Sequence, residues 1–182
     1  MKPFNSLKLT AAAALIAAAA ACEQKPAAAA PTPAPVTIDV DAKLKITQDA
    51  SGAYDFTYDS PYSDADGNFD FSVGEAAKAS VRLTFRLADD SGLGIKFKPD
   101  GTDAIWIVDK KNVGPDGSPQ GPYEGRQFRD FKVSEDGLSL SLFNRNDDGV
   151  LYRYGLRFDR GEETVIDDPD NQNGSGGNNG GN

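Results

Sequence analysis

The residues with the clearest chemical potential are oxygen-bearing side chains in two short loops. In the first loop they stand at alternate positions: Asp64, Asp66, Asn68 and Asp70. Calcium prefers several such oxygens from one tight loop. The second loop, residues 144–149, partly follows the same calcium-loop pattern, but no Glu stands where the bidentate ligand belongs. Because Asp, Asn and Gly also build tight turns, we expect two turns, no metal site and no cofactor.

A second candidate chemistry is hydrolysis by paired carboxylates. The chain has 28 Asp and Glu residues, so neighbouring acids are unavoidable. A catalytic acid needs a raised pKa, which an apolar environment supplies, and no acidic pair lies in an apolar run. We interpret these pairs as solvated turns and expect no catalytic residue: Asp89–Asp90, Asp147–Asp148, Glu162–Glu163 and Asp167–Asp168.

Two aromatic residues are candidates for contact with a ligand. Trp106 is the single tryptophan, and stacking on a sugar would need an exposed indole face. Its neighbours Ile105 and Ile107 favour a core position instead, in a central strand that is buried on both faces. Tyr123 lies in the Gly- and Pro-rich stretch 110–125, which is either a mobile excursion or a ligand-contacting loop.

Composition excludes several other kinds of site. The chain has no His, so it has no Ser-His-Asp triad, no Cys-His pair and no histidine metal ligand. One Cys allows neither an internal disulfide nor a cysteine zinc site. The formal net charge is −9 and both halves of the chain are acidic, so we expect no nucleic-acid partner.

The elements that must position any site are β-strands. Apolar and polar residues alternate with period two over 80–87, 138–142 and 150–158, with weaker cases at 36–40, 44–46, 54–58, 95–97 and 131–133. Asp-Gly pairs that suit tight turns begin at residues 66, 100, 116, 136 and 148. The pattern predicts one all-β domain over 36–170, an antiparallel β-sandwich with a barrel as the alternative. Its best-supported hairpin joins 138–143 to 150–158.

The N-terminal residues 1–21 read as a secretory signal peptide. Lys2 and Lys8 precede an apolar stretch that is too short to span a bilayer permanently. Cys22 follows directly, and this arrangement resembles a bacterial lipoprotein signal, although Ala19 stands where Leu is usual. The resemblance implies lipidation of Cys22, and Glu23 in place of Asp favours the outer membrane. An ordinary signal with an Ala-x-Ala cleavage site is the alternative.

The Ala- and Pro-rich residues 23–35 follow the cysteine and predict a disordered, extended linker. At the other end, ten of the twelve residues in 171–182 are Asn or Gly, which predicts a disordered tail.

A second resemblance concerns the stretch Leu151–Phe158 and the residues Thr164–Pro169 that follow. It resembles the C-terminal signature of the DP-EP family, small bacterial β proteins of undefined activity, although Asp170 and Asn171 replace an expected aliphatic pair. The resemblance implies an antiparallel β fold and carries over no catalytic residue.

Taken together, these observations predict a lipid-anchored, periplasm-facing domain of the bacterial cell envelope. We expect it to act by binding or scaffolding, with an envelope protein or a glycan as its partner. A carboxylate-dependent hydrolase and a calcium-stabilised module that binds carbohydrate or protein are the alternatives.

Overall fold

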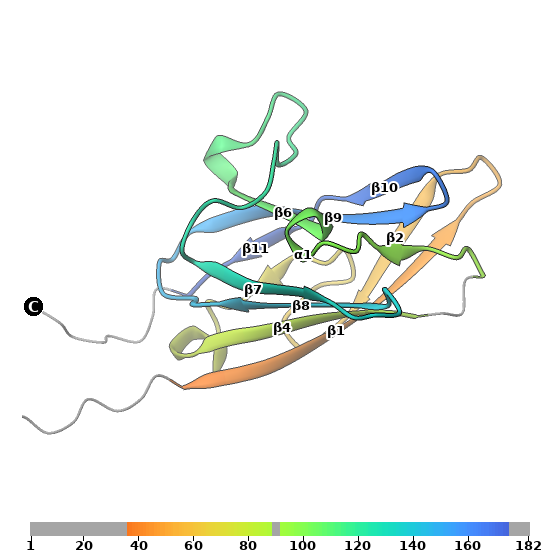
Figure 1. The fold of residues 1–182 in the computed structure, drawn as a ribbon. Coiled ribbons are helices and arrows are strands. Elements are labelled where there is room, and N and C mark those ends of the chain that lie inside the picture. The colour runs from red at the N-terminus through yellow and green to blue at the C-terminus, as the bar shows by residue number, and fades with distance from the viewer. Residues whose placement is uncertain (1–35, 89–91, 175–182) are drawn as a thin grey trace, which may run out of the picture. The chain divides into compact units, whose positions relative to one another are not determined.

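The computed structural model describes residues 36–88 and 92–174, which form a β domain of two packed sheets (Figure 1). The predicted signal peptide 1–21, Cys22 and the linker 22–35 lie outside the described residues, as do Asp89–Asp90 and residues 175–182. The all-β sandwich is confirmed, and within the described ranges neither sheet closes into a barrel.

The first sheet has five strands in the order β2-β1-β4-β8-β7. Its central pair, β1 and β4, is parallel, and the other neighbours are antiparallel, so the sheet is mixed rather than purely antiparallel as predicted. The strand bounds are β1 Thr37–Gln48, β2 Tyr54–Asp59, β4 Ser80–Leu87, β7 Phe128–Val133 and β8 Ser139–Asn144.

The second sheet is built around the long strand β9, Leu151–Arg160. Strands β10 and β11 follow one another along one edge of β9, β5 and β6 along the other, and β3 pairs with β11 in parallel. The bounds are β3 Phe69–Asp70, β5 Lys96–Phe97, β6 Ile105–Asp109, β10 Glu163–Asp167 and β11 Asp170–Gln172, and the short helices are η1 Ala76–Lys78, α1 Gly101–Ala104 and η2 Lys110–Asn112.

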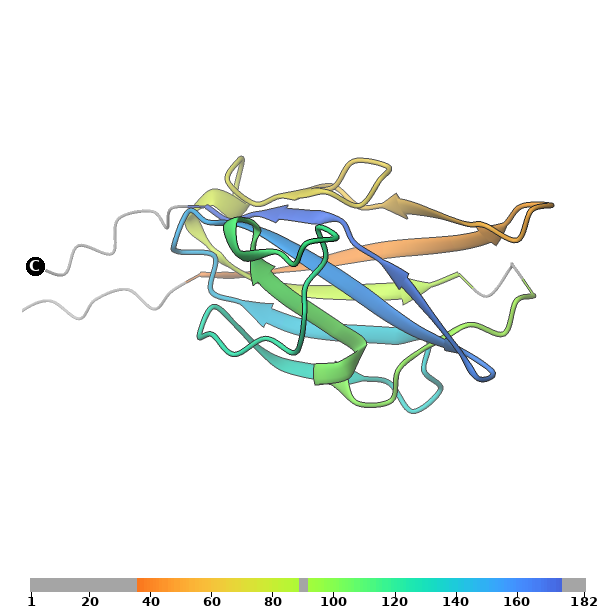
Figure 2. The same cartoon turned by 90° about the horizontal axis from the view of Figure 1, so that it is seen from above.

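The core lies between the two sheets, which pack face to face (Figure 2). The alternation predicted the inward faces correctly: Val81, Leu83 and Phe85 of β4 are buried, as are Tyr154 and Phe158 of β9. The outward side chains of β4 meet acids across the parallel pair, with Arg82 3.3 Å from Asp39 and Arg86 2.8 Å from Asp41. Exposed pairs of this kind add little stability, but they explain why charged residues occupy this face.

Three predictions about pairing and burial are wrong. Strands β8 and β9 do not form a hairpin, because residues 145–150 carry the chain from one sheet to the other. Strand β6 pairs only with β9 within the described residues, so it is an edge strand, and Trp106 lies on its outward side while Ile105 and Ile107 are buried.

The predicted C-terminal tail also begins too early. Residues 170–172 form β11 between β9 and β3, and Asn171 and Asn173 are buried. The body of the fold therefore extends to residue 174, because amide side chains that hydrogen-bond one another can be buried.

Candidate ligand-binding groove

A groove lies on the outward face of the second sheet, under the chain that follows η2. The segment 113–127 leaves the sheet after β6 and folds back over β6 and β9 before β7 begins (Figure 1). The groove has a volume of about 300 Å³. Its lining comes from β6, β9, the end of β10 and this segment: Trp106, Asp116, Ser118, Pro119, Gln120, Gly155, Arg157, Ile166 and Asp168.

The floor of the groove depends on a glycine in β9. Gly155 is on the outward side of the strand, where a side chain would ordinarily project. A Cβ at this position would lie 2.7 Å from Oδ1 of Asp168 and 3.7 Å from Cδ of Pro119. Glycine inside a strand often marks such a close approach. The missing side chain lets Asp168 and the buried Pro119 lie directly on the strand.

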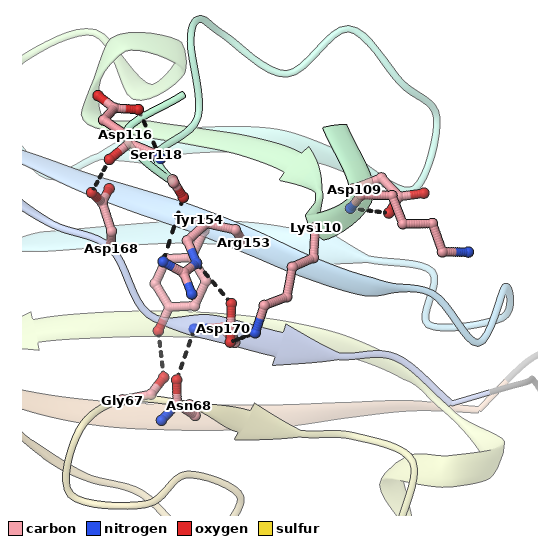
Figure 3. Close-up of polar contacts among 12 residues, drawn as sticks. Gly67, Asn68, Asp109, Lys110, Asp116, Ser118, Arg153, Tyr154, Asp168 and Asp170 are labelled. Carbon is pink, nitrogen blue, oxygen red and sulfur yellow. Dashed lines mark hydrogen bonds and ion pairs between the residues drawn. The ribbon is translucent and has the colours of Figure 1, made fainter. Parts of the chain in front are cut away.

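Polar contacts hold the segment to the sheet (Figure 3). The Ser118 hydroxyl donates to Oδ2 of Asp168 at 2.5 Å, and the Ser118 backbone N–H donates to Oδ1 of Asp116 at 3.1 Å. The Arg153 guanidinium reaches the carbonyl oxygen of Gly117 at 3.4 Å. These contacts fix Ser118 between two carboxylates at the edge of the groove.

A second layer of contacts lies beside them around Asp170, which also appears in Figure 3. Its carboxylate accepts from Nε of Arg153 at 2.8 Å and from Nζ of Lys110. Burial acts to raise the pKa of Asp170, but the hydrogen bonds from the two cations outweigh it and leave that pKa below its usual value. Because Arg153 binds both Asp170 and Gly117, β11 and the covering segment are held by one side chain.

The most distinctive pair in the groove is Trp106 and Arg157. The guanidinium carbon of Arg157 lies 3.8 Å from the centroid of the indole ring, a close cation–π contact. The same guanidinium is paired with the carboxylate of Asp103 in α1. The stack holds the indole of Trp106 in place within the lining of the groove.

Three polar atoms of the lining are buried without a hydrogen-bond partner among the described residues. They are Nε1 of Trp106, Nε of Arg157 and Oδ1 of Asp168. Leaving a buried donor or acceptor unpaired costs free energy, on the order of 1–3 kcal/mol each. Two donors and one acceptor therefore belong to the lining residues of a single groove, where they are closed off from solvent and lack a partner.

The second sequence candidate, Tyr123, has a structural role. Its hydroxyl accepts from the backbone N–H of Gln127 at 2.9 Å, and its ring packs edge-on against Phe128 at 5.1 Å between centroids. Tyr123 anchors the end of the segment to the core and is not among the groove residues.

The first calcium-candidate loop is a turn whose polar groups hydrogen-bond to one another. Asp64 accepts from the backbone N–H groups of Asp66 and Asn68 and from the Asn68 amide. The Asn68 side-chain hydrogen bond is the largest influence on Asp64 and lowers its pKa. Oδ1 of Asn68 accepts from the backbone of Asp170, and Asp70 accepts from Ser72. Within 36–88 and 92–174 no cluster of three or more acidic or cysteine side chains could hold a metal ion.

The second candidate loop carries a buried amide network. The Asn146 amide donates to the carbonyls of Phe71, Ala76 and Ala79, and its Oδ1 accepts from the backbone N–H of Gly174 at 2.6 Å. Asn173 accepts from the amides of two further buried residues, Asn144 and Asn171. These side chains connect the C-terminal segment to the body of the domain.

The interpretation of Asp167–Asp168 as a solvated turn is wrong. Asp167 ends β10 and accepts a hydrogen bond from the hydroxyl of Tyr58 in the other sheet. Burial raises its pKa to about 6. Its neighbour Asp168 points into the groove instead, so the two carboxyls occupy different environments.

Sequence reasoning identified Trp106 but missed its partners in the groove, Ser118, Arg157 and Asp168. Two signals were available. Gly155 interrupts a strand of otherwise large residues, and the prolines of 110–125 predict a segment that packs outside the sheets.

Comparisons with models of known protein families and with curated proteins find no match for this chain. The resemblances to a lipoprotein signal and to the DP-EP proteins stay hypotheses. Among residues 36–88 and 92–174, the structure contains no helix with the length and apolar character that a membrane span requires.

Proposed function

We propose that this protein is a binding domain of the bacterial cell envelope, anchored by a lipid at Cys22, and that the groove around Trp106 is its binding site. The single observation that carries the proposal is the set of unpaired buried atoms on Trp106, Arg157 and Asp168. Native proteins pair nearly all of their buried polar groups, and those that remain unpaired in a concave site are the groups that a ligand can satisfy.

The scaffold around the groove suits binding rather than chemistry. Both groove carboxylates are engaged in holding the covering segment, Asp168 with Ser118 and Asp116 with Ser118 and Gln120. The groove residues come from three strands and one segment, so the sheet holds most of them rigidly while the segment can adapt. The predicted Ala/Pro linker would hold the domain away from the membrane.

Trp106 itself provides the test, because tryptophan dominates protein fluorescence and the chain has one. The purified full chain is titrated with solubilised bacterial envelope separated into glycan, protein and lipid fractions. We expect a saturable change in Trp106 emission with one fraction, lost in Asp168→Ala and retained in Asp39→Asn, which alters an exposed ion pair on the other sheet. The absence of a response to every fraction, or an equal response in Asp168→Ala, would overturn the proposed site.

The anchor is tested separately. Mass spectrometry of the mature N-terminus should show a diacylglyceryl-modified Cys22, and Cys22→Ser should move the protein from the membrane fraction to the wash. An unmodified Cys22 in the mature protein would contradict the anchor and leave the groove proposal unaffected.

A further inference from the structure

We infer that the ligand of the groove is a neutral carbohydrate that presents neighbouring hydroxyl groups, an inference that rests on the proposed function. It follows from the hydrogen-bonding types of the unpaired atoms. Trp106 Nε1 and Arg157 Nε can only donate, and the carboxylate oxygen Oδ1 of Asp168 can only accept. A ligand that satisfies all of them must both accept and donate within one small volume.

A hydroxyl group does both. It accepts through its oxygen lone pairs and donates through its proton, so two adjacent hydroxyls can accept from the indole and guanidinium N–H groups while donating to Asp168. A protonated amine supplies only donors, which would leave both N–H groups unpaired. A carboxylate or phosphate supplies acceptors and would leave Asp168 unpaired.

The charge of the groove also disfavours anions. Asp116 and Asp168 line it, and its one cation, Arg157, is already paired with Asp103. A negatively charged ligand would therefore meet two carboxylates and a compensated guanidinium, within a chain whose formal net charge is −9. Like charges that share one small, partly desolvated site repel each other strongly.

Apolar surface completes the match to a sugar. Ile166 is 49% exposed beside the groove, and Pro119 and Trp106 form parts of its walls. A pyranose ring combines hydroxyl groups at its edge with C–H groups on its face, so it can cover this apolar surface while its hydroxyls reach the polar atoms. A peptide that adds as a strand would pair through its backbone along the edge of β6 and would leave the three side-chain atoms of the groove without a partner.

The three unpaired atoms are closed off from solvent, so entry of the sugar requires a movement of the lining, which we assign to residues 116–120. That segment is attached by a few polar contacts, the longest being the 3.4 Å bond from Arg153 to Gly117. Asp116 and Gln120 are exposed, and Pro119 is the buried residue of the segment that an outward shift would uncover.

The experiment is calorimetric titration of the full chain with matched trisaccharides at pH 6. The neutral set comprises trimers of glucose, mannose, galactose and N-acetylglucosamine; the charged set comprises the glucosamine trimer and trigalacturonic acid. We expect at least one neutral trimer to bind at least tenfold more tightly than either charged trimer. The N-acetylglucosamine and glucosamine trimers share one sugar backbone, and the acetyl groups replace each positive charge by a neutral amide.

Variants assign the binding to the groove. Trp106→Phe keeps an aromatic ring but removes the N–H donor, and Asp168→Ala removes the carboxylate acceptor. Each should weaken binding of the neutral trimer at least tenfold, while Asp39→Asn should change it less than twofold. Tighter binding of a charged trimer, or a response of Trp106 only to envelope protein, would overturn the carbohydrate inference while the binding groove stands. If Trp106 emission responds to none of the envelope fractions, both the binding groove and the carbohydrate inference are overturned.

Discussion

Gly155 of β9 and Asp168 beyond β10 are in direct contact across the outward face of the second sheet. A Cβ on residue 155 would lie 2.7 Å from the carboxylate oxygen Oδ1 of Asp168, closer than real Cβ contacts allow. The same oxygen is one of the three unpaired atoms of the groove. The geometry of the site therefore depends on the absence of a single side chain.

This relationship predicts the effect of Gly155→Ala. The new methyl group should displace Asp168, weaken its hydrogen bond to Ser118 and reduce ligand binding at least tenfold. Overpacking should cost about 1–3 kcal/mol of stability without unfolding the domain. Thermal melts and Trp106 emission measure the two effects. The control is Gly121→Ala in the covering segment, where a Cβ meets no atom within 4 Å. Native ligand binding by Gly155→Ala would contradict the described floor of the groove.

A second prediction concerns Asn146, which is 1% exposed and has a positive φ of 54°. Asn146→Ala removes its bonds to three carbonyls and to the Gly174 N–H, and alanine fits this backbone conformation less well. We expect a loss of about 3–5 kcal/mol in the free energy of unfolding. Urea denaturation measures it. Asn112→Ala, at an exposed position, should change stability by less than about 0.5 kcal/mol; equal stabilities for the two variants would refute the role of the network.

The alternation of apolar and polar residues predicted which side chains face the core, but it did not predict which strands pair. Val40, Ala42, Leu44 and Ile46 form one buried stripe of β1, which was predicted as two short strands because Ala42 is a weak hydrophobic signal. A period of two assigns each residue to one face of a sheet. It does not determine which strand pairs with which. The chain therefore crosses between sheets after β8 where a hairpin was predicted.

The C-terminal segment shows why composition alone failed there. Asparagine and glycine ordinarily predict disorder. Asn171 and Asn173 are nevertheless buried. The backbone of Asn171 pairs with β9 and β3, and the Asn173 side chain bonds to Asn144 and Asp148, 29 and 25 residues away in the sequence. No local pattern encodes such pairing. The groove was missed for the same reason, since Ser118 and Asp168 meet across fifty residues of chain.

A third prediction follows for truncations. A chain that ends after Pro169 lacks β11, which pairs with both β9 and β3. It should lose several kcal/mol of stability or fail to fold cooperatively. A chain that ends after Gly174 keeps the strand and its amide network and should unfold like the full chain. Urea melts followed by circular dichroism compare them. Full stability in the shorter chain would contradict the role assigned to β11.

A fourth prediction concerns pH. Burial raises the pKa of Asp167 to about 6, above its ordinary value of 3.8, so the folded state holds a proton more tightly than the unfolded state. The contribution of Asp167 to stability is therefore present below pH 3.8 and is lost as the pH rises to about 6. Five other aspartates have lowered pKa values, so their contributions to stability are lost only as the pH falls below 3.8. They are Asp49, Asp64, Asp100, Asp136 and Asp170.

The variant Asp167→Asn isolates this effect, because the neutral amide can still accept from the Tyr58 hydroxyl. Between pH 4 and pH 7, the melting temperature of the variant should rise relative to that of the parent protein as the pH rises. The matched control for removal of a carboxylate is Asp159→Asn, which breaks the part-buried ion pair with Lys98. A constant difference between parent and Asp167→Asn across this range would contradict the raised pKa.

The central claim is that a carbohydrate binds at Trp106, and one resonance tests it most directly. The single tryptophan gives a single indole N–H peak in a ¹H–¹⁵N correlation spectrum of the full chain. On titration with the neutral trisaccharide that binds in calorimetry, we predict that this peak shifts saturably and that the dissociation constant agrees with the calorimetric one. An indole peak that stays in place while the sugar binds would show that the binding site lies elsewhere.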